Sequence, residues 1–370
     1  MTALFDAITS QDLARGAVFL GTGGGGDPYV GELFLRKQLA AGLQPRLVPV
    51  ESLADDAFIA TIAGIGAPTV LVEHLVSEAA LKTLLKHAEA LYGRPLDAII
   101  SAEIGGANAM FPLAISAMMG LPVVDGDGIG RAFPHIEMTT FSIHGCQACP
   151  AIFADDLGNH AVVHATDNRT AEAMVRALTS ALNGCVYGVL YPMSGADVKR
   201  SAVRGTVTQA LEIGRHIRLA RRTSNEPVME IVCFLDGRDD NRRAKLLFAG
   251  KIADVVHETR DGFHWGQVTI EAIGDRDNRM TVEIQNEFLV ARRNGTTVAV
   301  VPDLLCILDT ETAEPLTAEM LRYGARVSVV AYGAPPVLLT PESLKVVGPR
   351  QFGLPDTWKP FADPEAAPCN

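Results

Sequence analysis

Cysteines are scarce in this sequence and widely spaced. The 370 residues hold six of them: Cys146, Cys149, Cys185, Cys233, Cys306 and Cys369. A small secreted domain that is stabilised by disulfides has a far higher share of cysteine. The N-terminus also lacks the basic start and the apolar segment of a secretory signal peptide. We therefore expect a cytoplasmic protein whose thiols are reduced.

Two further absences narrow the class of partner. The sequence has no stretch of about 18 apolar residues, which a membrane-spanning helix would need, and no basic run interleaved with aromatic residues. The formal net charge is -11. Because an acidic surface repels nucleic acid phosphates and anionic lipids, we expect neither nucleic acid nor a membrane as partner. We expect a small-molecule substrate instead, and a homo-oligomer, which is the usual state of soluble enzymes.

The length and the hydrophobic content of the chain are sufficient for two hydrophobic cores. Hydrophobic residues make up 48% of the chain, and its length exceeds that of one domain, about 100 to 200 residues. Residues 1–165 alternate short apolar runs with helical periodicity, which predicts an α/β domain with a parallel sheet. Residues 166–370 continue mainly with β-type runs between turn signals such as Asn294-Gly295, which predicts a β-rich (α+β) C-terminal domain.

The predicted elements follow from these patterns. In the first domain, helices are predicted over 10–20, 29–41, 77–92 and 108–119, and strands over 46–50, 58–63, 98–102 and 122–124. In the second domain, helices are predicted over 170–182 and 206–220, and β-type segments over 186–190, 228–235, 245–256, 267–273, 281–289, 297–301 and 326–331.

The most specific local motif is a glycine-rich turn that runs from Gly21 to Asp27. Its candidate binding residues are Thr22, Gly23, Gly24, Gly25, Gly26 and Asp27. Backbone amides of such a loop, at the start of a helix, can cradle an anion or a carbonyl group. No Gly-Lys-Ser/Thr follows the loop and a helix precedes it, so we expect no nucleotide. We predict that the loop binds a small, weakly charged ligand; the alternative is a tight connection or a hinge.

Polar residues follow two strands of the predicted parallel sheet. Glu103 and Asn108 come after the run 98–102, and Asp125, Asp127 and Arg131 come at the end of the next run. Ligands of open α/β sheets bind at the carboxyl ends of the strands. We predict that the carboxylates activate water or bind a divalent cation, and that Arg131 holds an anionic group. The alternative is that the two aspartates shape a turn and Arg131 pairs with one of them.

Soft ligands occur in the segment His144-Gly-Cys146-Gln-Ala-Cys149. Cys146 is a reserve nucleophile, although a buried thiol that only packs is the commoner case. His144 joins Asp125 and Asp127 as a candidate metal ligand. The metal would be Mg²⁺ or Mn²⁺ at a carboxylate site and Zn²⁺ at a site that includes histidine or cysteine.

Together these motifs resemble those of one family, the S-methyl thiohydantoin desulfurases, which are neighbours of hydantoinase and oxoprolinase systems. The resemblance covers nearly the full length. It is carried by Leu20-Gly-Thr-Gly-Gly-Gly-Gly-Asp-Pro28, Glu103-Ile-Gly-Gly-Ala-Asn108, Asp125-Gly-Asp-Gly-Ile-Gly-Arg-Ala-Phe-Pro134, Asn286-Glu287, Pro302-Asp303, Arg322-Tyr-Gly324 and Gly348-Pro-Arg-Gln-Phe-Gly353.

The resemblance implies an N-terminal α/β domain, a β-rich C-terminal domain, and hydrolysis of an S-methylated thiohydantoin to a hydantoin and methanethiol. We expect the glycine-rich turn and Asn108 to hold the ring. The residue after Phe133-Pro134 is usually glutamate in that family and is His135 here, a candidate general base or substrate contact. Two alternatives stay open: a hydantoinase- or oxoprolinase-like hydrolase or accessory subunit, and a non-catalytic ligand-binding protein.

Overall fold

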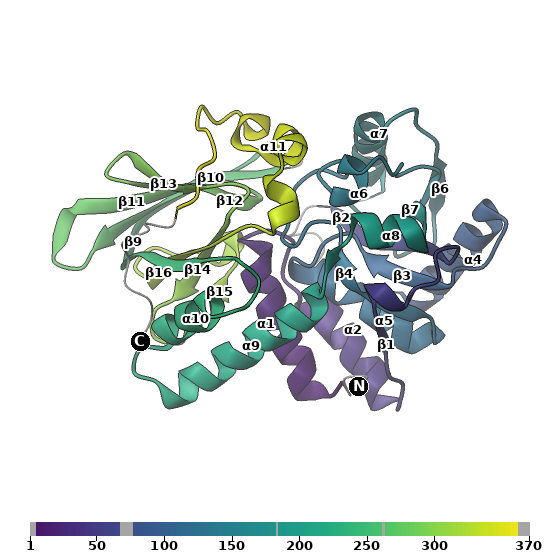
Figure 1. Cartoon of the computed structure of the whole chain (residues 1–370), viewed down its shortest axis with the longest axis horizontal. Helices are drawn as coiled ribbons and strands as arrows, with labels where there is room; N and C mark the ends of the chain where they lie inside the picture. The colour runs from purple at the N-terminus through teal and green to yellow at the C-terminus, as the bar shows by residue number, and fades with distance from the viewer. Residues whose placement is uncertain (1–4, 67–76, 183, 261–262, 362–370) are drawn as a thin grey trace.

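The computed structural model describes residues 5–66, 77–182, 184–260 and 263–361. They form two eight-stranded sheets that lie side by side, with helices around and between them (Figure 1). The first sheet contains parallel strands, and the second is antiparallel. The predicted order, an α/β half followed by a β-rich half, is confirmed.

The first sheet combines parallel and antiparallel strands. Its order is β1-β4-β3-β2-β7-β5-β6, with β8 paired to β4. Strands β1, β4, β3 and β2 run parallel as predicted, whereas β7 is antiparallel to β2. Both β7 and β8 come after residue 165, the expected end of the first domain, and lie in this sheet. The strands are β1 (Arg46–Pro49), β2 (Phe58–Gly66), β3 (Ala98–Ser101), β4 (Pro122–Asp127), β5 (Ala151–Ala154), β6 (His160–Val163), β7 (Cys185–Ser194) and β8 (Val203–Arg204).

Helices bury both faces of the first sheet. Successive side chains of a strand point to opposite faces, so in β3 Ile99 belongs to the same core as α1, α2, α4 and α5, whereas Ala98 and Ile100 belong to the core that includes α7 and α8. Strands that are buried on both faces are apolar throughout, which explains why short apolar runs identified them. The helices are α1 (Ala7–Gly21), α2 (Tyr29–Ala40), α4 (Glu78–Tyr92), α5 (Phe111–Met119), α6 (Thr140–Ile143), α7 (Asn168–Ala181) and α8 (Gly195–Ser201), with short turns η1 (Val50–Ser52) and η2 (Gly106–Ala109).

The second sheet has the order β13-β12-β11-β10-β9-β16-β14-β15. The long strands β9, β10 and β11 extend away from the first sheet (Figure 1). The strands are β9 (Ala244–Arg260), β10 (Phe263–Ala272), β11 (Asp275–Gln285), β12 (Glu287–Arg293), β13 (Thr296–Val300), β14 (Leu304–Asp309), β15 (Pro315–Leu316) and β16 (Arg326–Tyr332). The accompanying helices are α9 (Thr206–Thr223), α10 (Pro227–Asp236), α11 (Pro341–Val347), η3 (Ala318–Met320), η4 (Pro336–Leu339) and η5 (Pro349–Phe352).

The segment 228–235, predicted to be a strand, is helix α10. Its buried residues are Val228, Ile231, Val232 and Leu235, and this spacing of three, one and three residues marks one face of a helix. Pro227 occupies the first turn, where a helix tolerates proline. The helical spacing therefore outweighs the β-branched composition.

The predicted strand over 281–289 is two strands. The chain reverses at Asn286, whose φ is 57°, so that Gln285 of β11 pairs with Glu287 of β12. Asparagine adopts this left-handed conformation more readily than most residues. A segment of β-type residues thus contains a tight turn, and that turn contributes to the pocket described below.

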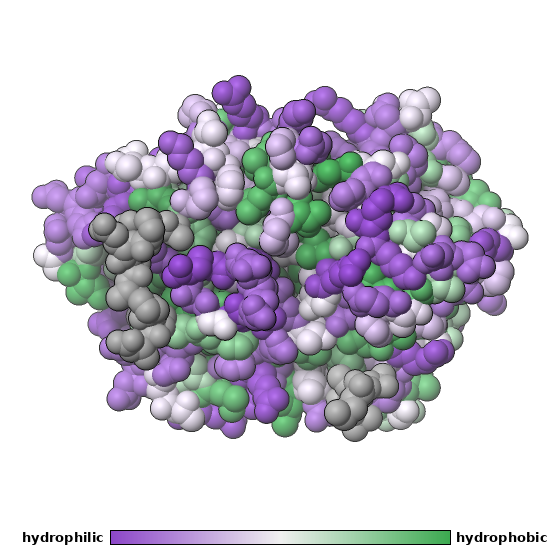
Figure 2. All heavy atoms as spheres, viewed as in Figure 1, coloured by the Kyte–Doolittle hydropathy of each residue, from purple (hydrophilic) through white to green (hydrophobic). Residues whose placement is uncertain are grey.

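One hydrophobic core connects the two halves. It runs from Ile99 and Val123 of the first sheet, through α1, α9 and α10, to Leu304 and Val330 of the second sheet. On the face shown in Figure 2, hydrophilic side chains cover most of the outer parts and hydrophobic ones gather near the middle. No helix in the described parts of the chain combines the length and hydropathy that crossing a bilayer would require.

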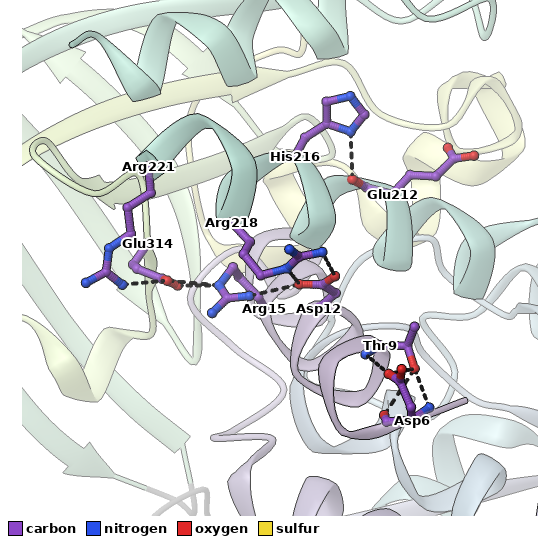
Figure 3. A network of polar contacts seen from close by, with 9 residues as sticks. All are labelled: Asp6, Thr9, Asp12, Arg15, Glu212, His216, Arg218, Arg221 and Glu314. Carbon is purple, nitrogen blue, oxygen red and sulfur yellow. Dashed lines mark hydrogen bonds and ion pairs between the residues drawn. The ribbon is translucent and has the colours of Figure 1, made fainter. Parts of the chain in front are cut away.

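Helices α1 and α9 pack closely, and ion pairs flank their contact (Figure 3). Asp12 accepts hydrogen bonds from Nε and Nη2 of Arg218, both at 2.8 Å. Arg15 donates from Nε to Glu314, at 2.8 Å to Oε2, and so ties α1 to the turn between β14 and β15. The close approach depends on glycine, because a Cβ on Gly214 would lie 1.7 Å from the carbonyl oxygen of Asp12.

Gly214→Ala should destabilise the protein although alanine favours helix by about 1 kcal/mol. The added methyl group must push α1 and α9 apart, and overpacking costs about 1–3 kcal/mol. We expect urea denaturation to give a lower free energy of unfolding than for the wild type. Arg215→Ala, an exposed neighbour on the same helix, should change it by less than about 0.5 kcal/mol; equal stability of both variants would contradict the packing argument.

Candidate active site

A pocket lies between the two sheets, at the carboxyl ends of the parallel strands. Its volume is about 790 Å³, including space open to solvent. Its wall is formed by residues at the ends of β2, β3 and β4, by α7 and β7, and by the turn between β11 and β12. This is the edge of the sheet where ligands of α/β proteins bind. The polar side chains in the wall are Glu103, Asn108, His135, Thr139, Glu172, Arg176, Tyr191, Asn286 and Glu287.

Two donors hold the carboxyl group of Glu103, which follows β3. Asn108 Nδ2 donates to Oε1 at 2.8 Å, and the Phe133 amide donates to Oε2 at 3.3 Å. Asn108 is itself fixed by Gly64 of β2, whose amide donates to Oδ1 at 2.7 Å. Burial nevertheless raises the pKa of Glu103 to about 7. A carboxyl group that is half ionised near neutral pH suits acid–base chemistry.

Glu287 brings a second carboxyl group into the wall, from the C-terminal half. Its side chain is buried, and Oε2 has no hydrogen-bond partner among the described residues. Burial raises the pKa of Glu287 well above its usual value, and the charge of Glu103 raises it further. As a polar pair beside apolar runs, Asn286-Glu287 is expected from sequence to be either site residues that face the first domain or ordinary turn formers. In the structure Asn286 reverses the chain, and both residues line the pocket.

The glycine-rich turn packs closely between the first sheet and β12. A Cβ on Gly23 would lie 2.7 Å from the ring of Phe288, and one on Gly24 would lie 2.2 Å from Oε1 of Glu287. The amide of Phe288 also donates to the carbonyl oxygen of Thr22 at 2.7 Å. Side chains at these positions would therefore collide with the second half of the protein, so close approach is one reason for the glycines.

Only part of the turn reaches the pocket. Gly25 and Gly26 lie in its wall. Asp27 lies at a separate surface groove, and its Oδ1 accepts a hydrogen bond from the amide of Tyr29 at 2.9 Å, at the start of α2. Thr22 is fully buried. The predicted ring contacts of the turn are thus confined to two of its six candidate residues.

The two aspartates of β4 contact backbone amides outside the pocket wall. Asp125 Oδ1 accepts from the amides of Val207 and Thr208 at 3.0 and 3.1 Å, at the start of α9. Asp127 Oδ2 accepts three backbone amides, including that of Ile104 at 2.8 Å. Burial raises the pKa of Asp127 to about 7. These are the contacts of residues that shape turns and helix ends.

Arg131 is fully buried and joins three segments of the chain. Its Nη1 donates to the carbonyl oxygens of Pro302 and Asp303, both at 2.9 Å, and its Nη2 donates to Thr22 Oγ1 at 2.8 Å. Burial lowers the pKa of Arg131 to about 10, and the charge of Glu287 opposes that shift. Arg131 is absent from the pocket wall, so its position fits a structural tie better than the predicted contact with an anionic ligand.

The structure does not bring together Asp125, Asp127 and His144, the predicted metal ligands. The aspartates are engaged as described, and His144 is exposed at the end of α6. Cys146 is buried in a hydrophobic cluster and is absent from the pocket wall, and burial raises the pKa of its thiol. A protonated, buried thiol is a poor nucleophile. Cys369 lies outside the described residues.

A different group can hold a metal. His135, Glu137 and Glu172 each offer one ligand atom, and these atoms all lie within 4.8 Å of one another. Glu172 Oε1, however, already accepts a hydrogen bond from Arg176 Nη2 at 2.5 Å. The rings of His135 and Phe263 are 5.1 Å apart, so β10 contacts this end of the pocket. His135 thus lies in the pocket wall, as predicted for a substrate contact.

Family models match both halves of the chain. The S-Me-THD-like N-terminal domain covers residues 9–165, and the S-Me-THD-like C-terminal domain covers residues 166–361. The chain belongs to the S-Me-THD-like family. The predicted membership is therefore confirmed, and the family name indicates a desulfurase-like enzyme. In this S-Me-THD-like fold, β7 and β8 belong to the segment that the second model matches, although they lie in the first sheet.

A solved structure has a similar fold. It is a crystal structure of a protein from Chromobacterium violaceum, with 25% sequence identity and a TM-score of 0.79. The similarity covers 97% of this chain and 100% of that one. No curated protein is a significant match to the sequence.

Arg131→Met should destabilise this S-Me-THD-like protein by about 3–5 kcal/mol, because it leaves several buried acceptors without donors. Urea denaturation followed by circular dichroism measures the change. Arg276→Met, at an exposed arginine of β11, is the matched control and should cost less than about 0.5 kcal/mol. A stable Arg131→Met variant that loses only substrate affinity would instead support the predicted ligand contact.

Proposed function

We propose that this protein is a hydrolase that converts an S-methyl thiohydantoin to a hydantoin and methanethiol, with Glu103 as the base that activates water. The observation that carries the proposal is the position of Glu103: its carboxyl group lies in the pocket wall, is oriented by Asn108, and has a pKa of about 7. Membership of the S-Me-THD-like family supports the substrate class.

The reaction needs a base and later an acid. Water must lose a proton as its oxygen bonds to the ring carbon that carries sulfur, and the departing methanethiolate must gain one when the C–S bond breaks. Ionised Glu103 accepts the first proton and returns it in the second step, so the residue is unchanged after each turnover. A group whose pKa lies near the working pH performs both transfers efficiently.

The remaining pocket residues have positioning and binding roles in this proposal. Asn108 bonds both Gly64 and Glu103, so we assign it to orienting the base and not to holding the ring. The ring would lie against Gly25 and Gly26 and the apolar side chains of Phe133 and Leu190, all of which line the pocket. Apolar surface for contact, with polar groups that fix the orientation, is typical of sites for small ligands.

The assay that tests the proposal measures methanethiol released from 5-substituted S-methyl thiohydantoins. Hydrolysis of hydantoin or 5-oxoproline rings without methanethiol release would identify a hydantoinase- or oxoprolinase-like hydrolase instead. Binding of a hydantoin in calorimetry without turnover of any of these compounds would identify a ligand-binding protein.

Glu103→Gln should lower kcat about 10²- to 10⁴-fold, the usual contribution of a general base. The wild-type rate should rise with pH through about 7, because Glu103 must be ionised, and this rise should be absent in the variant. Glu51→Gln, at a side chain that is 62% exposed, is the control and should keep the wild-type profile. Wild-type kinetics in Glu103→Gln would rule out the assignment.

Removal of metal by a chelator should leave the rate unchanged. Proton transfer to Glu103 requires no metal, and in the His135–Glu137–Glu172 group the carboxylate of Glu172 already accepts a hydrogen bond from Arg176. Elemental analysis before and after dialysis, with the methanethiol assay on both samples, measures this. Activity that is lost on chelation and restored by Zn²⁺ or Mn²⁺ would instead make a divalent metal part of the mechanism.

A further inference from the structure

We propose that Glu287 is a second catalytic residue, the acid that gives a proton to the substrate while ionised Glu103 takes one from water. The inference rests on the proposed function and adds a residue from the C-terminal half to the catalytic site. It starts from the geometry of a buried carboxyl group that lies in the pocket wall and has an oxygen atom without a partner.

The surroundings of Glu287 favour its protonated form. The side chain is buried, and Oε2 lacks a hydrogen-bond partner among the described residues. Desolvation of an ionised carboxylate is costly unless donors or a cation compensate for it. Arg131 attracts the Glu287 charge, but its hydrogen bonds go to other acceptors, among them Pro302 and Asp303. The charge of Arg131 thus only partly offsets the desolvation of Glu287.

The other charged groups near Glu287 are acidic. Glu103, after β3, and Glu319, in η3, both raise the pKa of Glu287 by their charge. The backbone of Gly24 also packs against Glu287, since a Cβ there would lie 2.2 Å from Oε1. Carboxyl groups that share a desolvated site cannot both ionise at low cost.

Hydrogen bonds decide which of the two carboxyl groups keeps the proton. Glu103 accepts from Asn108 at 2.8 Å and from the Phe133 amide at 3.3 Å, and both donors stabilise its ionised form. Oε2 of Glu287 has no such donor. The geometry therefore gives an ionised base and a protonated acid in one pocket, the arrangement that acid–base catalysis requires.

The proton transfers balance over one turnover. As water attacks the carbon that carries sulfur, Glu103 takes a proton from water and Glu287 gives its proton to the ring nitrogen that receives the displaced electron pair. The intermediate is then a neutral tetrahedral carbon with hydroxyl and methylthio groups. As the C–S bond breaks, the hydroxyl proton passes to Glu287, the proton on Glu103 passes to methanethiolate, and the carbonyl of the hydantoin forms. Both residues return to their starting states.

The first test needs no substrate. Infrared difference spectra of wild type and Glu287→Gln at pH 7, with ¹³C-labelled glutamate to assign the band, should show the C=O stretch of a protonated carboxyl in the wild type and its loss in the variant. Glu283→Gln, on the paired strand β11 with 40% of its side chain exposed, should retain the band. Thermal unfolding of each variant shows whether the fold is kept.

The second test uses the methanethiol assay across pH. The wild-type rate should fall at alkaline pH as Glu287 loses its proton, and Glu287→Gln should lower kcat about 10²- to 10⁴-fold and abolish that alkaline limb. Glu287→Asp, which restores an acid, should recover part of the rate and the limb. A purely structural role would lower stability without removing one limb of the profile.

The outcomes separate the two proposals. A wild-type protein that releases no methanethiol from any S-methyl thiohydantoin contradicts the proposed function and the catalytic role of Glu287 with it. An active wild type whose Glu287→Gln variant keeps its rate and alkaline limb contradicts the role of Glu287 alone. Absence of the infrared band in the wild type also contradicts it, because Glu287 would then carry no proton to give.

Discussion

The site depends on the hydrogen bonds and the charge of the buried Arg131 guanidinium. This group holds the glycine-rich turn through Thr22 and the second sheet through Pro302 and Asp303. The same charge acts on the buried carboxyl groups Glu103 and Glu287. A single cation near several acids in a desolvated region leaves negative charge that protons must neutralise. Arg131 is thus a structural tie whose charge also opposes the rise in pKa that burial causes in both carboxyl groups.

Much of the fold could be predicted because burial leaves a direct pattern in sequence. The parallel strands are short apolar runs covered on both faces, and helices such as α4 combine an apolar face with a cap at Ser77 and a terminal Gly93. The errors arise where two patterns overlap. In α10, β-branched residues have helical spacing, and at Asn286 one residue reverses the chain inside a β-type segment.

The candidate site was predictable only where it is local in sequence. The strand-end rule found Glu103 and Asn108, but it selected Asp125 and Asp127 equally, since the sequence does not reveal which carboxyl groups satisfy neighbouring amides. Glu287 comes from a turn of the other sheet, and no periodicity connects it to Glu103. Only tertiary packing brings the two into one pocket.

The position of β7 has a consequence for how the chain can be divided. Residues 185–194 lie within the segment matched by the C-terminal family model, yet they form the strand between β2 and β5 of the first sheet. A gene fragment that ends at residue 165 would leave the edge of β2 unpaired, an open template for intermolecular pairing. The segment matched by the first family model therefore depends on residues of the second segment to complete its sheet.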